Sequence, residues 1–245
     1  MFSPEGPSLR ELAVQALSSV ERGYDLLAPK FDHTPFRTPG SVLDATTAAL
    51  AELGPFADGL DLCCGTGAGL QVLEPLCQRL ITGVDFSVGM LAEARAAHPE
   101  AAWVRADARA LPFAAGFDLA VSFGAFGHFL PRERPAVFAG VHRALRPGGL
   151  FAFAIGAPAP LTSPAYWVEI GFDVVMRVRN AVWRPPFVMY YRTTPLGAVR
   201  DDLAAAGFDV TVAPLSVLGD RRDGSPRAGL VLARKQGKRE APGPG

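Results

Sequence analysis

Residues Leu60-Asp61-Leu62-Cys63-Cys64-Gly65-Thr66-Gly67-Ala68-Gly69 join a short apolar run to a stretch with helical spacing. Small residues at such a junction let the backbone approach a ligand closely, and a helix that begins there presents free N–H groups. In an open α/β sheet this junction lies at the carboxyl ends of the strands, where ligands bind. The decapeptide therefore predicts the first strand, turn and helix of a ligand-binding α/β fold.

Short apolar runs alternate with helical segments along the rest of the central chain. The expected strands are 59–64, 80–84, 102–105, 117–123 and 150–155, and the expected helices are 68–77, 88–97 and 132–145. This alternation predicts a parallel sheet with helices on both faces. Pro75 lies inside the first of these helices and predicts a kink or an early end there. A last unit, with expected strands at 188–192, 208–213 and 228–233 and a helix at 196–206, completes the sheet.

The flanking segments divide the chain into five parts. Helical spacing predicts a helix over 8–28 and a second helix over 40–53. Ser8 and Glu11 form a capping box at the start of the first helix. We assign these to an N-terminal helical cover. Residues 157–187 leave the strand–helix rhythm, and we interpret them as an inserted helical cap or as one more core-packing helix. The five parts are a cover (1–56), a core (57–156), a cap (157–187), a C-terminal completion of the sheet (188–234) and a disordered tail (235–245).

The composition excludes several classes of protein. The 245 residues carry 24 basic and 24 acidic side chains, and a neutral chain lacks the basic face that a nucleic-acid binder needs. Three cysteines are too few for a disulfide scaffold, and their spacing matches no metal site. No leader or spanning segment is apparent, so we expect a cytoplasmic protein. We also expect a monomer or a homodimer that holds no metal.

The spacing of the glycines separates two kinds of cofactor loop. A dinucleotide fingerprint needs a third glycine where Leu70 stands, and Asp61 would repel a pyrophosphate and suits a cationic ligand better. The segment resembles the first motif of the class I S-adenosylmethionine-dependent methyltransferases, with Cys63 in place of the first glycine and Gly65 and Gly67 matching the later ones. A nicotinamide oxidoreductase is the alternative that the loop alone leaves open.

The resemblance continues in register over 60–156. It implies a Rossmann-like, doubly wound, mainly parallel seven-stranded α/β sheet with N-terminal helices and S-adenosylmethionine as the cofactor. By the same resemblance Asp85 accepts hydrogen bonds from the ribose hydroxyls, since a carboxylate suits a vicinal diol. Asp107 accepts one from the adenine amine, and Phe86 and Met90 pack on the adenine. Two further stretches match the fourth-strand and fifth-strand motifs, Phe117 to Phe123 and Leu145 to Leu150.

The resemblance also assigns candidate site residues. Tyr24 contacts the methionine moiety or is a core tyrosine. His128 follows the fourth strand, beside the transferable methyl group, and acts as a general base or only orients the cofactor. The implied cofactor-binding residues are Tyr24, Asp61, Cys63, Gly65, Thr66, Gly67, Asp85, Phe86, Met90, Asp107, Ala108, Phe123 and Gly124.

The acceptor has to be inferred from the cover and the cap. Their aromatic side chains favour an apolar, aromatic or lipid-like small molecule over a peptide or nucleic acid. We expect O- or C-methylation in the biosynthesis of a secondary metabolite, with ubiquinone/menaquinone-type C-methylation and a catalytically silent S-adenosylmethionine-binding regulator as alternatives. The candidate acceptor residues are His33, Tyr166, Trp167, Trp183, Phe187 and Tyr190.

Overall fold

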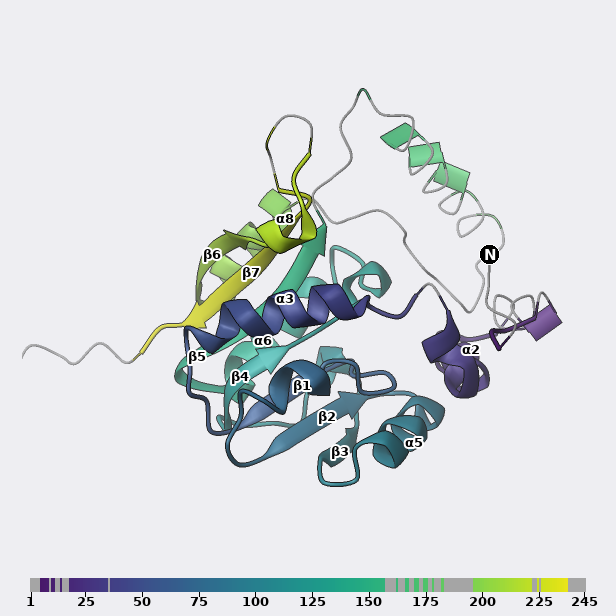
Figure 1. Ribbon diagram of the computed structural model, residues 1–245, viewed down its shortest axis with the longest axis horizontal. Coiled ribbons are helices and arrows are strands. Elements are labelled where there is room, and N and C mark those ends of the chain that lie inside the picture. Colours follow the sequence, from purple (N-terminus) through teal and green to yellow (C-terminus); the bar gives the residue numbers. More distant parts are fainter. Residues whose placement is uncertain are drawn as a thin grey trace, which may run out of the picture.

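The computed structural model describes residues 5–8, 10–11, 14, 18–34, 36–156, 196–221, 224 and 226–237, with single positions and pairs between 162 and 182. Within these ranges a seven-stranded sheet carries helices on both faces (Figure 1). The strand order is β3-β2-β1-β4-β5-β7-β6. The strands are β1 (Gly59–Leu62), β2 (Ile81–Asp85), β3 (Ala102–Arg105), β4 (Phe117–Val121), β5 (Leu145–Gly156), β6 (Phe208–Pro214) and β7 (Ala228–Lys235).

The direction of the strands confirms the predicted α/β architecture. Strands β1 to β5 are parallel, and β7 lies antiparallel between β5 and β6. The chain passes outward from β1 through β2 to β3 and then returns to β4 on the other side of β1. This reversal of strand order creates a crevice at the carboxyl ends of β1 and β4, where open α/β sheets bind ligands.

The helices follow the expected order, and α5 and β3 have the predicted bounds. The α-helices are α2 (Val20–Leu27), α3 (Gly40–Ala51), α4 (Leu70–Leu73), α5 (Val88–Ala97), α6 (Arg134–Ala144) and α8 (Leu196–Ala205). Short 3-10 helices add η1 (Ala28–His33), η2 (Ala108–Ala110), η3 (Phe126–His128) and η4 (Ser216–Leu218).

Two predicted helices differ by several residues from the observed ones. The single N-terminal helix is wrong, because the chain bends at Ser18 and α2 begins afresh with Ser19, whose Oγ accepts a hydrogen bond from the Arg22 amide at 3.2 Å. The helix expected over 68–77 ends at Leu73, which confirms the early end that Pro75 predicts.

Strand β5 begins earlier than predicted. Phe117 of β4 pairs with Leu145, whereas Leu119 pairs with Leu150, so residues 146–149 form an irregularity inside the strand. Gly148 has a φ of 81°, a value that suits glycine.

Strand β7 extends further than predicted. Lys235 belongs to this strand rather than to a tail, and its ammonium donates to the carbonyls of His142 and Leu145 at 2.7 and 2.8 Å. Residues 188–192 and 238–245, for which a strand and a tail are predicted, lie outside the described part of the chain.

Alternating side chains divide the core into two layers. Phe151 and Phe153 of β5 lie in the cluster that α6 and α8 cover. Leu150 and Ala152 face the other cluster, which contains Leu43 of α3 and Leu73 of α4. Successive side chains of a strand point to opposite faces, so each run of apolar residues serves both layers. The sheet is thus buried on both sides, which leaves its strand ends as the place for polar side chains.

The amino ends of the strands are closed by an ionic cluster. Arg146 donates to Asp58 and to Asp118 at 2.7 Å each, and Asp118 also accepts the amides of Ala57 and Asp58. The side chain of Asp58 is only 4% exposed, so Arg146 neutralises a buried charge. This cluster lies at the sheet edge opposite the crevice and holds the start of β1 against β4.

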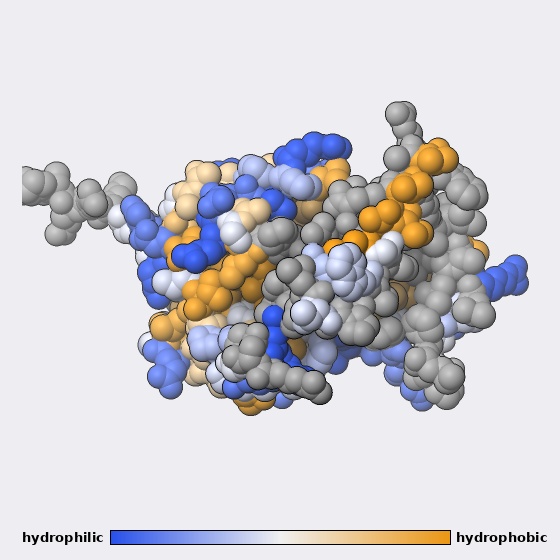
Figure 2. Space-filling view, turned by 90° about the horizontal axis from the view of Figure 1, so that it is seen from above, coloured by the Kyte–Doolittle hydropathy of each residue, from blue (hydrophilic) through white to orange (hydrophobic). Residues whose placement is uncertain are grey.

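The described positions between 166 and 182 are helical, which agrees with a helical segment there. Figure 2 shows apolar side chains from this segment together on the surface seen from above. The exposed ones are Trp167, Val174, Val175, Val178 and Val182. Whether the segment covers the acceptor site stays a prediction. In the part of the chain that the structure describes, no helix is long and apolar enough to cross a membrane.

Candidate functional site

A cavity of about 410 Å³ lies at the carboxyl ends of β1, β2 and β4, beside α2 and η1. Its size falls within the range of about 300–1000 Å³ that small-molecule sites occupy. Its walls combine three carboxylates with many aromatic rings. The lining residues are Tyr24, Phe31, Phe36, Thr38, Asp61, Cys63, Cys64, Gly65, Thr66, Ala68, Gly69, Asp85, Phe86, Met90, Ala106, Asp107, Ala108, Arg109, Phe123, Gly124, Ala125, Gly127, His128 and Phe129.

Asp61 is the most deeply buried acid of the cavity. Only 1% of the residue is exposed, and its Oδ2 atom has no hydrogen-bond partner in the described part of the chain. Burial and the neighbouring carboxylate of Asp85 raise the pKa of Asp61 well above its usual value, against a hydrogen bond from the Gly69 backbone. A buried carboxylate oxygen without a donor costs free energy. The site is therefore suited to a ligand that brings a cationic N–H group.

Asp85, at the end of β2, links the glycine loop to the start of α5. Its Oδ2 accepts the Gly65 amide at 3.0 Å and its Oδ1 accepts the Ser87 amide at 2.9 Å. Burial raises the pKa of Asp85 despite these hydrogen bonds. Each carboxylate oxygen can accept a second hydrogen bond, so the two together can receive the two hydroxyl groups of a ribose.

Asp107 is engaged by a residue that the sequence analysis missed. The guanidinium of Arg109 donates to both oxygens of Asp107 at 2.6 to 3.0 Å, and it also pairs with Glu133 at 2.8 Å. The Arg109 hydrogen bonds lower the pKa of Asp107. An adenine amine that approaches Asp107 therefore meets an acceptor that already receives several N–H groups. A charged pair two residues apart at the start of the short η2 has no periodic signature, so the sequence did not reveal it.

In the glycine-rich loop after β1, every second residue from 63 to 67 has a positive φ. Cys63, Gly65 and Gly67 have φ values of 55°, 53° and 97°. Gly67 was expected to bind the cofactor, but it does not line the cavity, because its α-carbon faces the imidazole of His98, where a Cβ would lie 2.9 Å from the ring. Cys63 lines the cavity in a left-handed conformation that favours glycine, and burial raises the pKa of its thiol. The cysteine side chain thus packs in the site and supplies no reactive thiolate.

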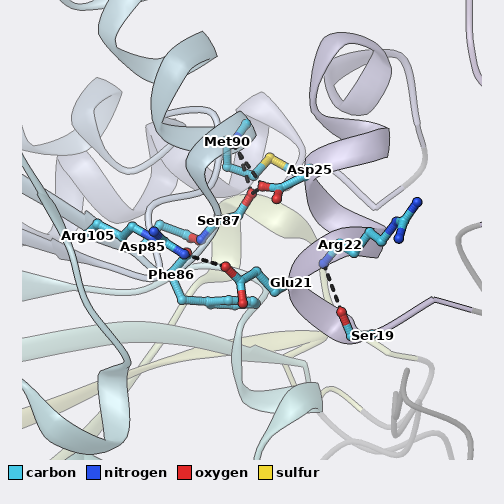
Figure 3. A network of polar contacts seen from close by, with 10 residues as sticks. Ser19, Glu21, Arg22, Asp25, Asp85, Phe86, Ser87, Met90 and Arg105 are labelled. Atoms are coloured by element: carbon cyan, nitrogen blue, oxygen red, sulfur yellow. Dashed lines mark hydrogen bonds and ion pairs between the residues drawn. The ribbon is translucent and has the colours of Figure 1, made fainter.

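Helix α2 is fastened to the start of α5 (Figure 3). The Oδ1 atom of Asp25 accepts the Ser87 hydroxyl at 2.6 Å and the Gly89 amide at 2.9 Å. A Cβ at Gly89 would lie 2.9 Å from the α-carbon of Asp25, so only glycine allows this close approach. One turn earlier, Glu21 pairs with Arg105 of β3. The N-terminal cover is therefore held directly beside the carboxylate of Asp85.

The same helix brings Tyr24 across the cavity to His128. The Tyr24 hydroxyl lies 2.6 Å from Nε2 of His128, and the two rings meet edge to face at a centroid distance of 5.4 Å. Tyr24 also contacts the rings of Phe31 and Phe86, with centroids 6.2 and 6.3 Å away. Tyrosine and histidine are 104 residues apart in sequence, so this contact depends on the packing of α2.

Several predicted acceptor residues do not line the cavity. His33 lies on the outer side of η1, where its Nδ1 is 3.3 Å from Glu5, and Trp167 is 63% exposed. Tyr166 contacts Trp167 rather than the cavity. Trp183, Phe187 and Tyr190 lie outside the described residues. Three aromatic residues that the sequence did not single out do line the cavity, namely Phe31, Phe36 and Phe129.

Metal ligands do not gather in the described residues. No group of three or more His, Cys, Asp or Glu side chains there could hold a metal ion. The three cysteines, at positions 63, 64 and 77, are free thiols.

Comparison with known proteins finds a matching family profile, similar sequences and a similar crystal structure. The profile of a family described as "Methyltransferase domain" matches residues 60–149. A protein of Synechocystis named "uncharacterized methyltransferase" is 34% identical over 159 residues, which cover 64% of this chain and 69% of that protein. A demethylmenaquinone methyltransferase of Beutenbergia cavernae is 41% identical over 100 residues, 39% of each chain. The crystal structure of an S-adenosylmethionine-dependent methyltransferase from Mesorhizobium loti is 26% identical, with a TM-score of 0.56 over 80% of this chain and 98% of that one.

Proposed function

Because this chain belongs to the class I S-adenosylmethionine-dependent methyltransferases, with S-adenosylmethionine as its cofactor, we propose that it methylates an oxygen or carbon atom of an apolar or aromatic small molecule. The observation that carries the proposal is the division of the cavity wall. Its acids come from β1, β2 and the turn after β3, whereas most of its aromatic rings come from the N-terminal segment and the loop after β4.

The acidic wall fits the cofactor. The unpartnered Oδ2 of Asp61 would receive the ammonium group of its methionine part, and the oxygens of Asp85 would receive the ribose hydroxyls. Asp107 would receive the adenine amine once Arg109 gives up part of its contact. When bound, S-adenosylmethionine supplies a methyl group on a positively charged sulfur. Cys63, Gly65 and Thr66 would lie along this ligand, since they line the same wall.

The aromatic wall supports an acceptor of low polarity. Phe36, Phe129 and Phe31 line the cavity beside Thr38, and none of these four carries a charge. A peptide or a nucleotide would bring polar groups that this wall does not pair, and unpaired buried polar groups weaken binding. An aromatic or aliphatic ring suits these side chains, and a pathway of secondary metabolism would supply such a molecule.

His128 is the group that we propose to accept the proton of a hydroxyl acceptor. It lies on η3, in the loop after β4, and lines the cavity next to the aromatic side chains. Alignment of donor and nucleophile provides the main rate acceleration in a displacement of this kind, and a base adds to it where the nucleophile must lose a proton. The chain's task is thus to exclude water, align the acceptor and remove one proton.

The test is a screen of phenolic, enolic and amine acceptors with radiolabelled S-adenosylmethionine, together with calorimetry of S-adenosylhomocysteine and NADH. We expect binding of S-adenosylhomocysteine and label transfer to an aromatic hydroxyl or an activated carbon. Binding of S-adenosylhomocysteine without label transfer to any acceptor would instead support a regulatory binding protein. Tight binding of NADH alone would contradict the assignment of the acidic wall.

Quinone-type C-methylation is the second candidate. It draws on the demethylmenaquinone methyltransferase of Beutenbergia cavernae and on a 2-phytyl-1,4-naphthoquinone methyltransferase of Thermosynechococcus vestitus, which is 35% identical over 103 residues. Inclusion of demethylmenaquinone and of a hydroxylated naphthoquinone in the screen separates the two. Transfer to a ring carbon of the quinone favours this candidate, and transfer to a hydroxyl group favours the first.

A further inference from the structure

We propose that Tyr24 and His128 form a proton relay in which Tyr24 contacts the hydroxyl group of the acceptor and His128 receives the proton through Tyr24. The inference rests on the proposed function and narrows it to acceptors with an un-ionised hydroxyl group. It also assigns the N-terminal helix α2 a part in the reaction, because Tyr24 reaches the cavity only from that helix.

The geometry of the pair supports a relay. The Tyr24 hydroxyl and Nε2 of His128 are 2.6 Å apart, within the normal range for an O–H···N hydrogen bond. With Nε2 engaged in this way, the phenol oxygen is the atom of the pair that remains able to accept a proton from a third group. Both residues line the cavity together with the aromatic wall. An acceptor hydroxyl beside them therefore meets the tyrosine oxygen before the imidazole.

The position of Tyr24 is set by its neighbour in sequence. Asp25 holds α2 against α5 through one carboxylate oxygen, which accepts both the Ser87 hydroxyl and the Gly89 amide. The ring of Tyr24 then rests edge-on against Phe86, which follows the ribose-binding candidate Asp85. The relay is thus assembled only while α2 lies on α5, and Asp25 is the positioning residue that keeps it there.

The proton transfer balances without any added reactant. The acceptor proton moves to the Tyr24 oxygen while the Tyr24 proton moves to Nε2 of His128. The acceptor oxygen keeps the electron pair of its O–H bond and uses it to form the new bond to the methyl carbon, while the sulfur keeps the pair of the bond that breaks. The imidazolium of His128 afterwards releases its proton to water. Because the arrangement needs Nε2 as an acceptor, the ring proton of neutral His128 must sit on Nδ1.

The first test compares Tyr24→Phe with the native enzyme on a series of phenols. For phenols that are un-ionised at the assay pH, we expect kcat to fall by about 10²- to 10⁴-fold, as for the loss of a general base, and for a nitrophenol that is already ionised by less than about tenfold. Calorimetry should show unchanged affinity for S-adenosylhomocysteine. The matched control is Glu11→Gln, which removes the charge from the exposed ion pair with Lys30 in the same N-terminal segment and keeps an oxygen that can accept the Ser8 amide.

The second test uses the positioning residue. Asp25→Asn keeps an oxygen that can accept from Ser87 and Gly89, whereas Asp25→Ala does not. We therefore expect Asp25→Ala to reproduce the preference of Tyr24→Phe for the ionised nitrophenol, and Asp25→Asn to restore the native pattern. Equal effects of the two Asp25 substitutions on both phenols would remove the positioning role.

The third test needs no turnover. Nitrogen-15 NMR of the ligand-free protein should show neutral His128 with its proton on Nδ1, and Tyr24→Phe should shift the Nε2 resonance. A native His128 that carries its proton on Nε2 overturns the relay.

The turnover measurements of the first test can overturn it as well. A Tyr24→Phe enzyme that methylates un-ionised phenols at the native rate does so, because His128 would then act directly. If the native enzyme methylates no phenol, the relay is wrong, whereas the proposed function falls only if no activated carbon is methylated either.

Discussion

Replacement of Asp61 by asparagine should change cofactor binding and stability in opposite directions. The substitution keeps the shape and one oxygen that can accept the Gly69 amide, but it removes the negative charge from a side chain that is 1% exposed and has an unpartnered Oδ2. The ligand-free protein loses a buried charge that nothing in the described chain neutralises. The bound cofactor loses the partner that we propose for its ammonium group.

The expected magnitudes follow from these two losses. Removing one partner of a buried charge pair costs about 2–4 kcal/mol, which raises the dissociation constant of S-adenosylmethionine about 30- to 700-fold. Relief of the buried charge should stabilise the ligand-free protein by about 1–2 kcal/mol, and each kcal/mol raises Tm by about 2–4 °C in a chain of this length. Both changes are large enough to measure in one preparation.

The gain in stability should depend on pH. Burial raises the pKa of Asp61 above its unfolded value of about 3.9, so between these two pKa values the native state holds a proton that the unfolded state has released. The free energy of unfolding of the native protein therefore falls as the pH rises through this window, and asparagine lacks this contribution. The difference in Tm between the variant and the native protein should accordingly widen as the pH increases from about 4.

Calorimetric titration and thermal melts at several pH values measure both effects. Asp44→Asn is the control, since Asp44 is exposed on α3 and should change neither quantity. If Asp61→Asn binds S-adenosylmethionine with native affinity, the carboxylate has no cationic partner in the complex. If the variant is less stable at every pH, then the unpartnered oxygen carries no penalty and the reasoning from burial is wrong.

Three further changes test the packing around the site. Gly89→Val should push α2 away from α5, because a Cβ would lie 2.9 Å from the Asp25 α-carbon, and turnover should fall while circular dichroism stays native. Gly69→Ala would place a Cβ 2.4 Å from the carboxylate of Asp61 and displace that group, so calorimetry should show weaker cofactor binding. Arg146→Met leaves the buried Asp58 with only the exposed Arg79, 3.6 Å away, as an ionic partner in the described chain; at a cost of about 3–5 kcal/mol, the expected fall in Tm is about 6–20 °C.

Local patterns predicted the central sheet well because each strand and helix there carries its own signal. The bounds of α5 and β3 agree with the prediction, since Ser87 caps the helix and a short apolar run forms the strand. Pro75 predicted the short α4 correctly, because a proline interrupts a helix whatever packs around it. Ser19 carried a similar signal, but its N-cap was not recognised because the apolar spacing continues through it.

Contacts between distant segments were the part that the sequence did not reveal. The resemblance suggested that Tyr24 and His128 both lie near the cofactor, but their hydrogen bond depends on how α2 packs on α5. Gly67 was predicted to bind the cofactor from its motif position, yet it does not line the cavity, and a Cβ there would point at His98. A motif specifies which residues form a loop, whereas the direction that each residue faces is set by the helices packed around it.

The two ends of the sheet differ in how their acids are balanced, and this difference bears on product release. Arg146 neutralises Asp58 and Asp118 at the amino ends, whereas the described chain offers no ion pair to Asp61 or Asp85 at the carboxyl ends. The cofactor enters with a positive sulfur and leaves as a neutral thioether. The negative potential of the crevice attracts the charged form more strongly than the neutral form. Methyl transfer itself thus weakens the electrostatic attraction between the crevice and the spent cofactor, which favours its release.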